Sequence, residues 1–340
     1  MNPNPINSLS EDHVFGQSYI SVGTYSQPLV TFALFAFNQE QYIREAVEGA
    51  LSQSYTPMEI ILSDDSSSDR TFEIMKKMAK SYNGPNKVKV RKNKINLGLA
   101  AHVSVVAHES IGEIFILAGG DDISLPDRTT VSVNLLKSNP NSTAVLLSAD
   151  VIDHKGSTVV DLSRKNLKKG DYVQNIDSLL GWKHVTFGAT RAIRREVFIR
   201  FGPLNNDCPT EDTPLLLRSL MCGSNIISDR KVILYRKHEK NISSFQSLKK
   251  LSISSIYDQY FDDINKAEKS GWISYDLAAR LRDWMFCDLR LRLLRQNMLT
   301  PAFLGYRELI SLAKNPMIKL RTKIKFLLTY LSFFANKYFL

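Results

Sequence analysis

Three features are scarce in this sequence of 340 residues: cysteine, long apolar runs and early basic residues. The three cysteines are too few and too scattered for a disulfide framework or a zinc knuckle, which favours a reducing compartment. The first Lys or Arg is Arg44, which follows the apolar stretch 29–37, so the pattern of a secretory signal is missing. The most apolar stretches, 29–37 and 326–335, fall far short of the ~20 residues that a membrane-spanning helix needs. We therefore expect a cytoplasmic chain without a transmembrane helix.

The rest of the composition is that of an ordinary folded protein. Hydrophobic residues make up 44% of the chain and charged residues 23%, which excludes a disordered or collagen-like polypeptide. The length suits one large domain, or a catalytic domain with an appendage.

The net charge of +10 is concentrated near one end of the chain. Ten Lys or Arg and one acid lie from Arg290 onward, a net charge of +9, so the preceding 289 residues sum to +1. A nucleic-acid-binding protein usually carries its basic surface on the folded recognition element. We therefore expect no nucleic-acid partner and interpret the basic end as a clue to localisation.

Strand and helix patterns alternate over the first third of the sequence. Apolar runs of strand length lie at 29–37, 58–62, 88–90 and 114–118, and helical spacing lies between them at 40–53, 69–80 and 99–110. Strands that alternate with such helices form a mostly parallel sheet with helices on both faces, which predicts an α/β fold. Ligands of these sheets bind beyond the carboxyl ends of the strands.

The later sequence predicts a division into three regions. Residues 1–28 are polar, lack a sustained period and are expected to be a mostly irregular leader. Residues 29–245 form the α/β domain, with further strands at 144–152, 157–160 and 231–235 and helices at 195–201 and 214–221. Beyond these, residues 246–340 are predicted to be a helical, basic region.

Paired acidic residues fall at predicted loop positions. The groups are Asp64-Asp65, Asp121-Asp122, Glu211-Asp212, and Arg236 with His238. Adjacent carboxylates repel one another, so a cation or a hydrogen-bond donor is expected to compensate them. Mg²⁺ or Mn²⁺ bound together with a nucleotide diphosphate is the simplest candidate. Each pair could also cap a helix or complete a turn, and the pattern alone leaves both interpretations open.

The order of the motifs resembles the family 2 glycosyltransferases of the GT-A fold. The resemblance covers about residues 28–245 and rests on seven segments in the family's order. These are FNQEQYIREAVEGALSQSY, EIILSDDSSSDRT, NLGLA, GGDDI with Pro126, FGATRAIRREVFIRFGPL, TEDTPLLLR and YRKHEKNIS. It implies a Rossmann-like, mixed but mostly parallel sheet flanked by helices, here with a helical C-terminal extension.

The resemblance also implies a role for individual residues. The donor would be bound by Phe37, Asn38, Asp64, Asp65, Asn96 and Asp121; the metal by Asp121, Asp122 and His238; and Glu211 and Arg236 would support the site. Asp212 matches the general base. Gly119 stands where the family usually has an Asp, a departure that bears on metal dependence.

The implied reaction is a single displacement that inverts the anomeric carbon. The expected donor is a UDP-sugar, and the expected acceptor is a hydroxyl of a saccharide or of a lipid-linked saccharide in the assembly of a surface polysaccharide. Because such a hydroxyl is a weak nucleophile at neutral pH, a carboxylate must take its proton as the new bond forms. Trp182 and His184 are acceptor candidates by their chemistry, and the alternative is that they belong to the core.

Two other functions fit parts of the sequence. A catalytically inactive scaffold that binds a nucleotide-sugar or a membrane would explain Gly119. A sugar nucleotidylyltransferase would share the strand and helix order, but it needs a glycine-rich, arginine-containing phosphate loop after the first strand, and residues 37–40 offer none.

The C-terminal end carries an amphipathic pattern. The apolar seam consists of Met317, Leu320, Ile324, Leu327, Leu331 and Phe334, with basic residues around its first half. A basic amphipathic helix with aromatic residues is typical of binding in the plane of an anionic membrane surface. This predicts a peripheral protein on the cytoplasmic face of the membrane; packing of the seam on the catalytic domain is the alternative.

Overall fold

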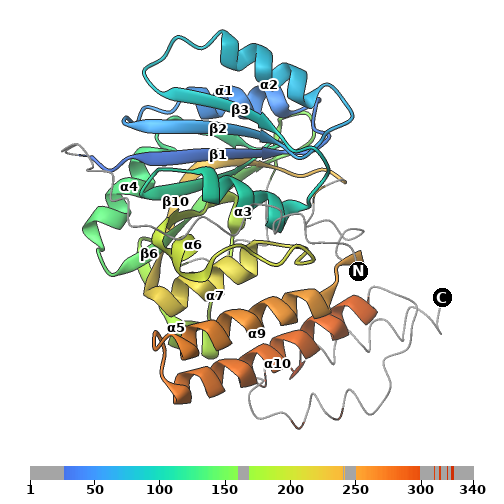
Figure 1. The fold of residues 1–340 in the computed structure, drawn as a ribbon. Coiled ribbons are helices and arrows are strands. Elements are labelled where there is room, and N and C mark those ends of the chain that lie inside the picture. The colour runs from blue at the N-terminus through green and yellow to red at the C-terminus, as the bar shows by residue number, and fades with distance from the viewer. Residues whose placement is uncertain are drawn as a thin grey trace, which may run out of the picture.

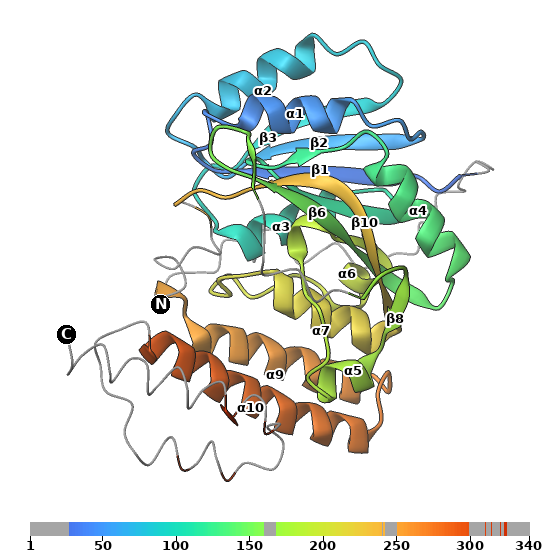
Figure 2. The same cartoon turned by 180° about the vertical axis from the view of Figure 1, so that it is seen from behind.

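A computed structural model describes residues 27–159, 168–239, 241 and 250–298, together with residues 310, 314, 320, 323 and 324. Most of the predicted leader, residues 1–26, therefore lies outside the described residues. Within the described ranges the strands form one ten-stranded mixed sheet in the order β3-β2-β1-β4-β9-β6-β10-β5, with β7 and β8 at its sides. Helices cover both faces of this sheet (Figures 1 and 2).

The first part of the chain builds a parallel half-sheet. Its elements are β1 (Val30–Ala36), α1 (Ile43–Leu51), β2 (Met58–Asp64), α2 (Thr71–Lys80), β3 (Lys87–Lys92), α3 (Leu99–Glu109) and β4 (Ile114–Gly119). β1 lies between β2 and β4 and is parallel to both. The predicted strands and helices of this region are confirmed, and the carboxyl ends of β1, β2 and β4 lie at one edge of the sheet.

The second part completes the sheet with mixed pairings. Its elements are β5 (Ile123–Ser124), α4 (Arg128–Ser138), β6 (Ser142–Ile152), β7 (Thr158–Val159), β8 (Tyr172–Gln174), α5 (Ile176–Leu180), β9 (Ala192–Arg194), α6 (Glu196–Phe201), α7 (Asp212–Cys222) and β10 (Ser224–Arg236). β9 lies between β4 and β6 and is antiparallel to both. β6 and β10 pair in parallel. The sheet is therefore mixed, as predicted.

Two apolar layers hold the helices to the sheet. On β1, Phe32 and Leu34 point to the layer that contains α1 and α4, whereas Ala33 and Phe35 point to the layer that contains α3 and α7. This alternation is the period of two that a strand buried on both faces requires. The nearly continuous apolar run is explained by burial of Val30–Ala36 on both sides.

The C-terminal helices α9 (Ile253–Lys269) and α10 (Tyr275–Met298) pack side by side below α7 (Figure 1). Ile264 and Trp284 join the same apolar layer as Phe35. A buried ion pair also joins the regions, because Arg218 Nε of α7 lies 2.8 Å from Asp263 Oδ2 of α9. The helical C-terminal extension is thus confirmed, while the predicted domain boundaries stay a prediction. None of the described helices is long and apolar enough to cross a bilayer.

Candidate functional site

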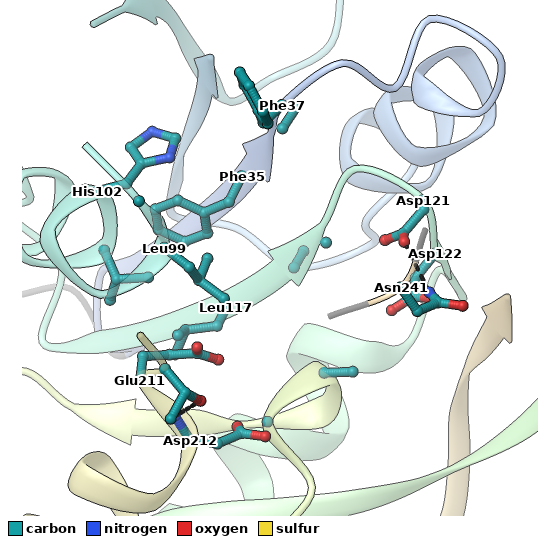
Figure 3. A pocket seen from close by; sticks show the side chains of 18 of the residues that line it. Phe35, Phe37, Leu99, His102, Leu117, Asp121, Asp122, Glu211, Asp212 and Asn241 are labelled. Atoms are coloured by element: carbon teal, nitrogen blue, oxygen red, sulfur yellow. Dashed lines mark hydrogen bonds between the residues drawn. The ribbon is translucent and has the colours of Figure 1, made fainter. Parts of the chain in front are cut away.

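A cavity of about 780 Å³ opens beyond the carboxyl ends of β1 and β4 (Figure 3). Segments far apart in the sequence contribute its polar walls. The charged and amide side chains among its lining residues are Gln39, Asp65, Asn96, His102, Asp121, Asp122, Glu211, Asp212, Lys237, Asn241 and Arg292. The acidic groups at three predicted loop positions therefore meet in one cavity, as ligand binding at the carboxyl edge of such a sheet requires.

Asp65 organises the wall formed by the start of α3. Its Oδ1 accepts hydrogen bonds from Asn93 Nδ2 at 2.7 Å and from the Leu97 amide at 2.9 Å, and its Oδ2 accepts one from the Gly98 amide at 3.0 Å. Asn96 donates from Nδ2 to the Asp65 carbonyl at 3.3 Å. Asp65 thus fixes the loop before α3, and both it and Asn96 line the cavity.

Asp64 and Asn38 lie outside the lining, while Phe37 is part of it. The Asp64 side chain is fully buried, and its Oδ2 accepts a hydrogen bond from the Ser67 amide at 2.9 Å. Asn38 has a positive φ of 51°, which Asn tolerates better than most residues. Its Oδ1 accepts from the Ser68 amide at 2.9 Å, so Asn38 ties the end of β1 to the loop after β2. The predicted donor role of these two residues stays a prediction.

Asp121 is held from the side of β10. His238 Nε2 lies 2.9 Å from Asp121 Oδ2, and Asn241 Nδ2 donates to the same oxygen at 3.1 Å. Tyr42 stacks on the His238 ring with 4.9 Å between ring centroids. His238 is therefore behind Asp121 and outside the cavity lining, within reach of the same carboxylate.

Arg236 fixes the loop that carries both aspartates. Its amide donates to Asp122 Oδ1 at 2.9 Å, and its Nε donates to the Asp121 carbonyl at 3.0 Å. Its guanidinium also pairs with Glu45 and lies over the Tyr42 ring. The side chain is almost fully buried, so Arg236 supports the site through the backbone of this loop.

Asp122 is a buried acid next to another acid. Burial and, secondarily, the charge of Asp121 raise the pKa of Asp122 well above its usual range, although the Arg236 amide, Arg128 and Arg236 oppose the shift. A bound cation would stabilise the ionised form of such a carboxyl. The two adjacent carboxylates therefore suit a divalent cation that prefers oxygen ligands.

The remaining ligands of such a cation would have to come from elsewhere. Across the described ranges, no group of three or more His, Cys, Asp or Glu side chains is arranged to hold a metal ion. Mg²⁺ is commonly bound by one or two carboxylates together with substrate phosphates and water, so Asp121 and Asp122 are sufficient for that mode. Gly119 lies close to both: a Cβ there would be 2.9 Å from Asp121 Oδ1.

Asp212 begins α7 on the opposite wall of the cavity (Figure 3). Its side chain is 36% exposed, and Arg191 Nη1 lies 3.7 Å from its Oδ1. Arg191 is fully buried, and neither of these two atoms has a hydrogen-bond partner among the described residues. A half-buried carboxylate with a buried cation behind it can accept a proton from a bound hydroxyl.

Glu211 adjoins Asp212 and is nearly buried. Burial, followed by the charge of Asp212, raises the pKa of Glu211 to about 8, while Arg191 opposes the shift. Glu211 therefore holds a proton at neutral pH. The two carboxyl groups differ in role because their environments differ, and Asp212 has the greater access to solvent.

Trp182 and His184 lie outside the cavity lining. Both rings pack near Trp284 of α10, with centroid distances of 6.0 Å and 6.2 Å. This placement favours the core alternative, and an acceptor role for these two residues stays a prediction without support from their position.

Several cavity residues were not predicted from the sequence. The Nε2 atom of His102, in α3, lies 2.5 Å from Ser63 Oγ. Burial lowers the pKa of His102 to about 4, so its ring is neutral at pH 7. Asn241, Gly188 and Arg292 were also missed. Asn241 and Gly188 fall within the quoted motifs YRKHEKNIS and FGATRAIRREVFIRFGPL, whereas no local signal points to Arg292.

Comparison with known proteins agrees with this geometry. A family model described as glycosyl transferase family 2 matches residues 31–202. EpsE of Bacillus subtilis is 34% identical over 131 residues, which is 38% of this chain and 46% of that protein. The chain spans about half the length of the first curated relatives it matches.

Two solved structures share the GT-A fold with this chain. The mannosyltransferase PcManGT from Pyrobaculum calidifontis, in complex with GDP-Man and Mn²⁺, has a TM-score of 0.56 and 17% identity over 92% of this chain and 81% of its own. S. aureus TarS 1-349, in complex with UDP-GlcNAc, has a TM-score of 0.52 and 14% identity over 80% of this chain and 83% of its own.

Proposed function

The chain belongs to glycosyl transferase family 2, and we propose that it transfers a sugar from a nucleotide diphosphate to a hydroxyl of a saccharide acceptor. The observation that carries this proposal is the single cavity that Asp65, Asp121 and Asp212 share. These residues come from the loops after β2 and β4 and from the start of α7, so a donor bound at the sheet edge would lie beside the Asp212 carboxylate.

The donor would occupy the side of the cavity formed by β1 and α3. Phe37 and Asn96 offer an aromatic face and an amide there, next to the loop that Asp65 holds. A UDP-sugar is the donor we propose; the similar TarS structure holds UDP-GlcNAc, whereas PcManGT holds GDP-Man.

Mg²⁺ or Mn²⁺ would be held by Asp121 and Asp122, with His238 adjacent. When bound, such a cation stabilises the negative charge that develops on the departing diphosphate. Asn241 and His238 orient Asp121 by their hydrogen bonds to Oδ2, and Arg236 holds the backbone of both aspartates.

Asp212 would act as the general base. Its carboxylate accepts the proton of the acceptor hydroxyl while that oxygen forms a bond to the anomeric carbon. The bond from the anomeric carbon to the diphosphate oxygen breaks in the same step, and the nucleoside diphosphate leaves. Because the hydroxyl attacks from the face opposite the leaving group, the anomeric configuration is inverted.

Replacement of the base tests the reaction directly. Asp212→Asn keeps the shape of the side chain but removes its capacity to accept a proton, so sugar transfer and donor hydrolysis should fall by a factor of ~10² to 10⁴. A panel of nucleotide sugars, scored by release of the nucleoside diphosphate, identifies the donor first. Turnover by Asp212→Asn equal to that of the unchanged enzyme would contradict the assignment and leave the inactive scaffold as the better hypothesis.

The proposed acceptor is a saccharide or a lipid-linked saccharide in surface polysaccharide assembly. The residues of the C-terminal seam lie outside the described residues except for Leu320 and Ile324. Both of these are helical and exposed, at 72% and 47% of their surface. Their exposure supports the proposal that the seam binds an anionic membrane surface and holds the enzyme at the cytoplasmic face.

A further inference from the structure

The C-terminal helical region contributes a charged side chain to the cavity. Arg292 of α10 lines it together with Leu251, which precedes α9. α9 packs against α7, the helix that begins at Asp212, and α10 packs against α9 (Figure 2). The C-terminal helical region and the helix of Asp212 therefore contribute to the same cavity.

The guanidinium of Arg292 is oriented by two neighbours. Its Nε donates to Asp288 Oδ2 at 2.6 Å, one helical turn earlier, and its Nη2 lies 3.5 Å from Tyr260 Oη. Its Nη1 makes no hydrogen bond to any residue that the structure describes, and the side chain is 25% exposed. One edge of the guanidinium is therefore fixed while another remains available to a molecule in the cavity.

This arrangement is better explained by binding than by stability. An ion pair at a partly buried position gains little over apolar packing, because desolvation of the two charges offsets their attraction. An arginine held on a rigid helix is, in contrast, the side chain best suited to bidentate recognition of phosphate.

The Asp212 carboxylate makes a cation necessary for an anionic acceptor. Asp212 lines the same cavity as Arg292, and a phosphate placed beside its carboxylate would be repelled. Arg292 would offset that repulsion, together with Lys237, which also lines the cavity. A neutral saccharide would need no such cation.

We propose that Arg292 binds a phosphate group of the acceptor, so that the acceptor is a phosphate-bearing saccharide. This inference rests on the proposed function, because the donor is assigned to the opposite side of the cavity. The same chemistry is offered by a soluble sugar phosphate and by a lipid-linked one. In either case α10 is part of the acceptor site.

Calorimetry with phosphate esters tests the inference without knowledge of the acceptor sugar. The full chain is first saturated with UDP and Mn²⁺, which occupies the diphosphate subsite, and is then titrated with methyl phosphate. We expect one methyl phosphate per chain, and binding weakened at least tenfold in the double variant Asp288→Asn/Arg292→Gln. This pair of changes removes both charges together, so no buried carboxylate is left unpaired. Arg292→Lys should bind at an intermediate affinity, since it keeps the charge without the planar fork.

A matched control lies two residues away on the same helix. Arg290 is exposed and lies over the Phe286 ring, so Arg290→Gln should leave the affinity unchanged. Decyl phosphate distinguishes the two sources: an Arg292-dependent affinity at least tenfold above that of methyl phosphate indicates a lipid-linked acceptor, and equal affinities indicate a soluble one. No binding of either ester, or binding that the Arg292 variants do not alter, would overturn the inference. Failure of UDP itself to bind would instead contradict the proposed function.

Discussion

The Asp212 carboxylate occupies the space in front of Gly188. A Cβ built on Gly188 would overlap this carboxylate, closer to Oδ1 than atoms of real side chains approach. Gly188 lies in a 3-10 turn, Gly188–Thr190, directly before Arg191. The absence of a side chain at this position therefore lets the proposed base lie against the turn, with the guanidinium of Arg191 behind it.

Gly188→Ala should displace Asp212 and reduce catalysis while leaving donor binding intact. Because positioned general bases contribute roughly 10²- to 10⁴-fold, we expect kcat to fall at least tenfold with the dissociation constant for UDP unchanged. Steady-state kinetics and calorimetry measure the two quantities.

The double variant Gly188→Ala/Asp212→Asn shows whether Gly188 acts through Asp212. If it does, adding Gly188→Ala to Asp212→Asn should reduce kcat little further, because contacting residues are non-additive. Multiplicative losses in the double variant would mean that Gly188 matters for another reason, such as the folding of the turn.

Glu211 predicts a pH dependence of stability. Its pKa is raised to about 8 in the folded chain, above the ordinary value of 4.5, so the folded state binds the extra proton between these values. Stability should therefore fall as pH rises from about 5 to 8, relative to a variant that cannot ionise. Glu211→Gln is that variant, and the difference in unfolding free energy should change by up to about 1.4 kcal/mol per pH unit. Urea unfolding at pH 5, 6, 7 and 8 measures it.

Replacement of Arg191 tests whether the charges around Glu211 set this pH dependence of stability. Its charge lowers the pKa of Glu211, against burial and Asp212, which raise it. In Arg191→Met the pKa of Glu211 should rise further, so the decline in stability relative to the matching Glu211→Gln double variant should continue above pH 8. An identical pH profile with and without Arg191 would show that the guanidinium has no influence on this carboxyl.

The parts of the fold that follow from local pattern were predicted from the sequence. The strands β1, β2 and β4 are buried on both faces, so their continuous apolar runs mark them clearly. β10 is longer than the predicted strand at 231–235. Its middle carries the polar residues Ser228, Asp229 and Arg230 beside register shifts in its pairing with β6, so the apolar pattern that marks a strand is interrupted there. β9 is only three residues long and exists through its pairing with β4 and β6, which no local pattern reveals.

The site was predicted where its residues follow strands and missed where it depends on packing. Asp65, Asp121 and Asp212 follow from their places in the motifs. Arg191 and Arg292 reach the site from elements whose neighbours are fixed only by the tertiary fold. The difference between Asp64 and Asp65 has the same origin: successive side chains point to opposite sides, and only one can face the cavity.

Removal of divalent cations should weaken binding of the nucleoside diphosphate. If Asp121 and Asp122 hold Mn²⁺ together with the diphosphate, EDTA should reduce the affinity for UDP at least tenfold, and Asp121→Asn should lower it to a similar level and make it insensitive to EDTA. Calorimetry with UDP in the presence of Mn²⁺ and of EDTA measures both effects. Asp127→Asn, at the residue that precedes α4, is the matched control, since Asp127 lies outside the cavity lining. Equal affinities for UDP with and without Mn²⁺ would contradict the metal site. They would indicate that UDP binding needs no metal in this enzyme, in which Gly119 replaces the usual Asp.

The C-terminal seam should bind anionic vesicles. A chain that ends at Lys314 lacks the seam, so the full chain should sediment with vesicles that contain phosphatidylglycerol and the shortened chain should remain in the supernatant. Each basic residue near such a surface contributes about 1 kcal/mol. Replacing Lys319, Arg321, Lys323 and Lys325 by Gln should therefore reduce binding by roughly a hundredfold or more, and added salt should mimic the effect by screening.

Leu320→Ser with Ile324→Ser removes apolar area at unchanged charge. Because both side chains are exposed, this variant should lose membrane affinity while the folded domain keeps its melting temperature. If it sediments normally but melts at a lower temperature, the seam packs on the protein, and the membrane proposal is wrong.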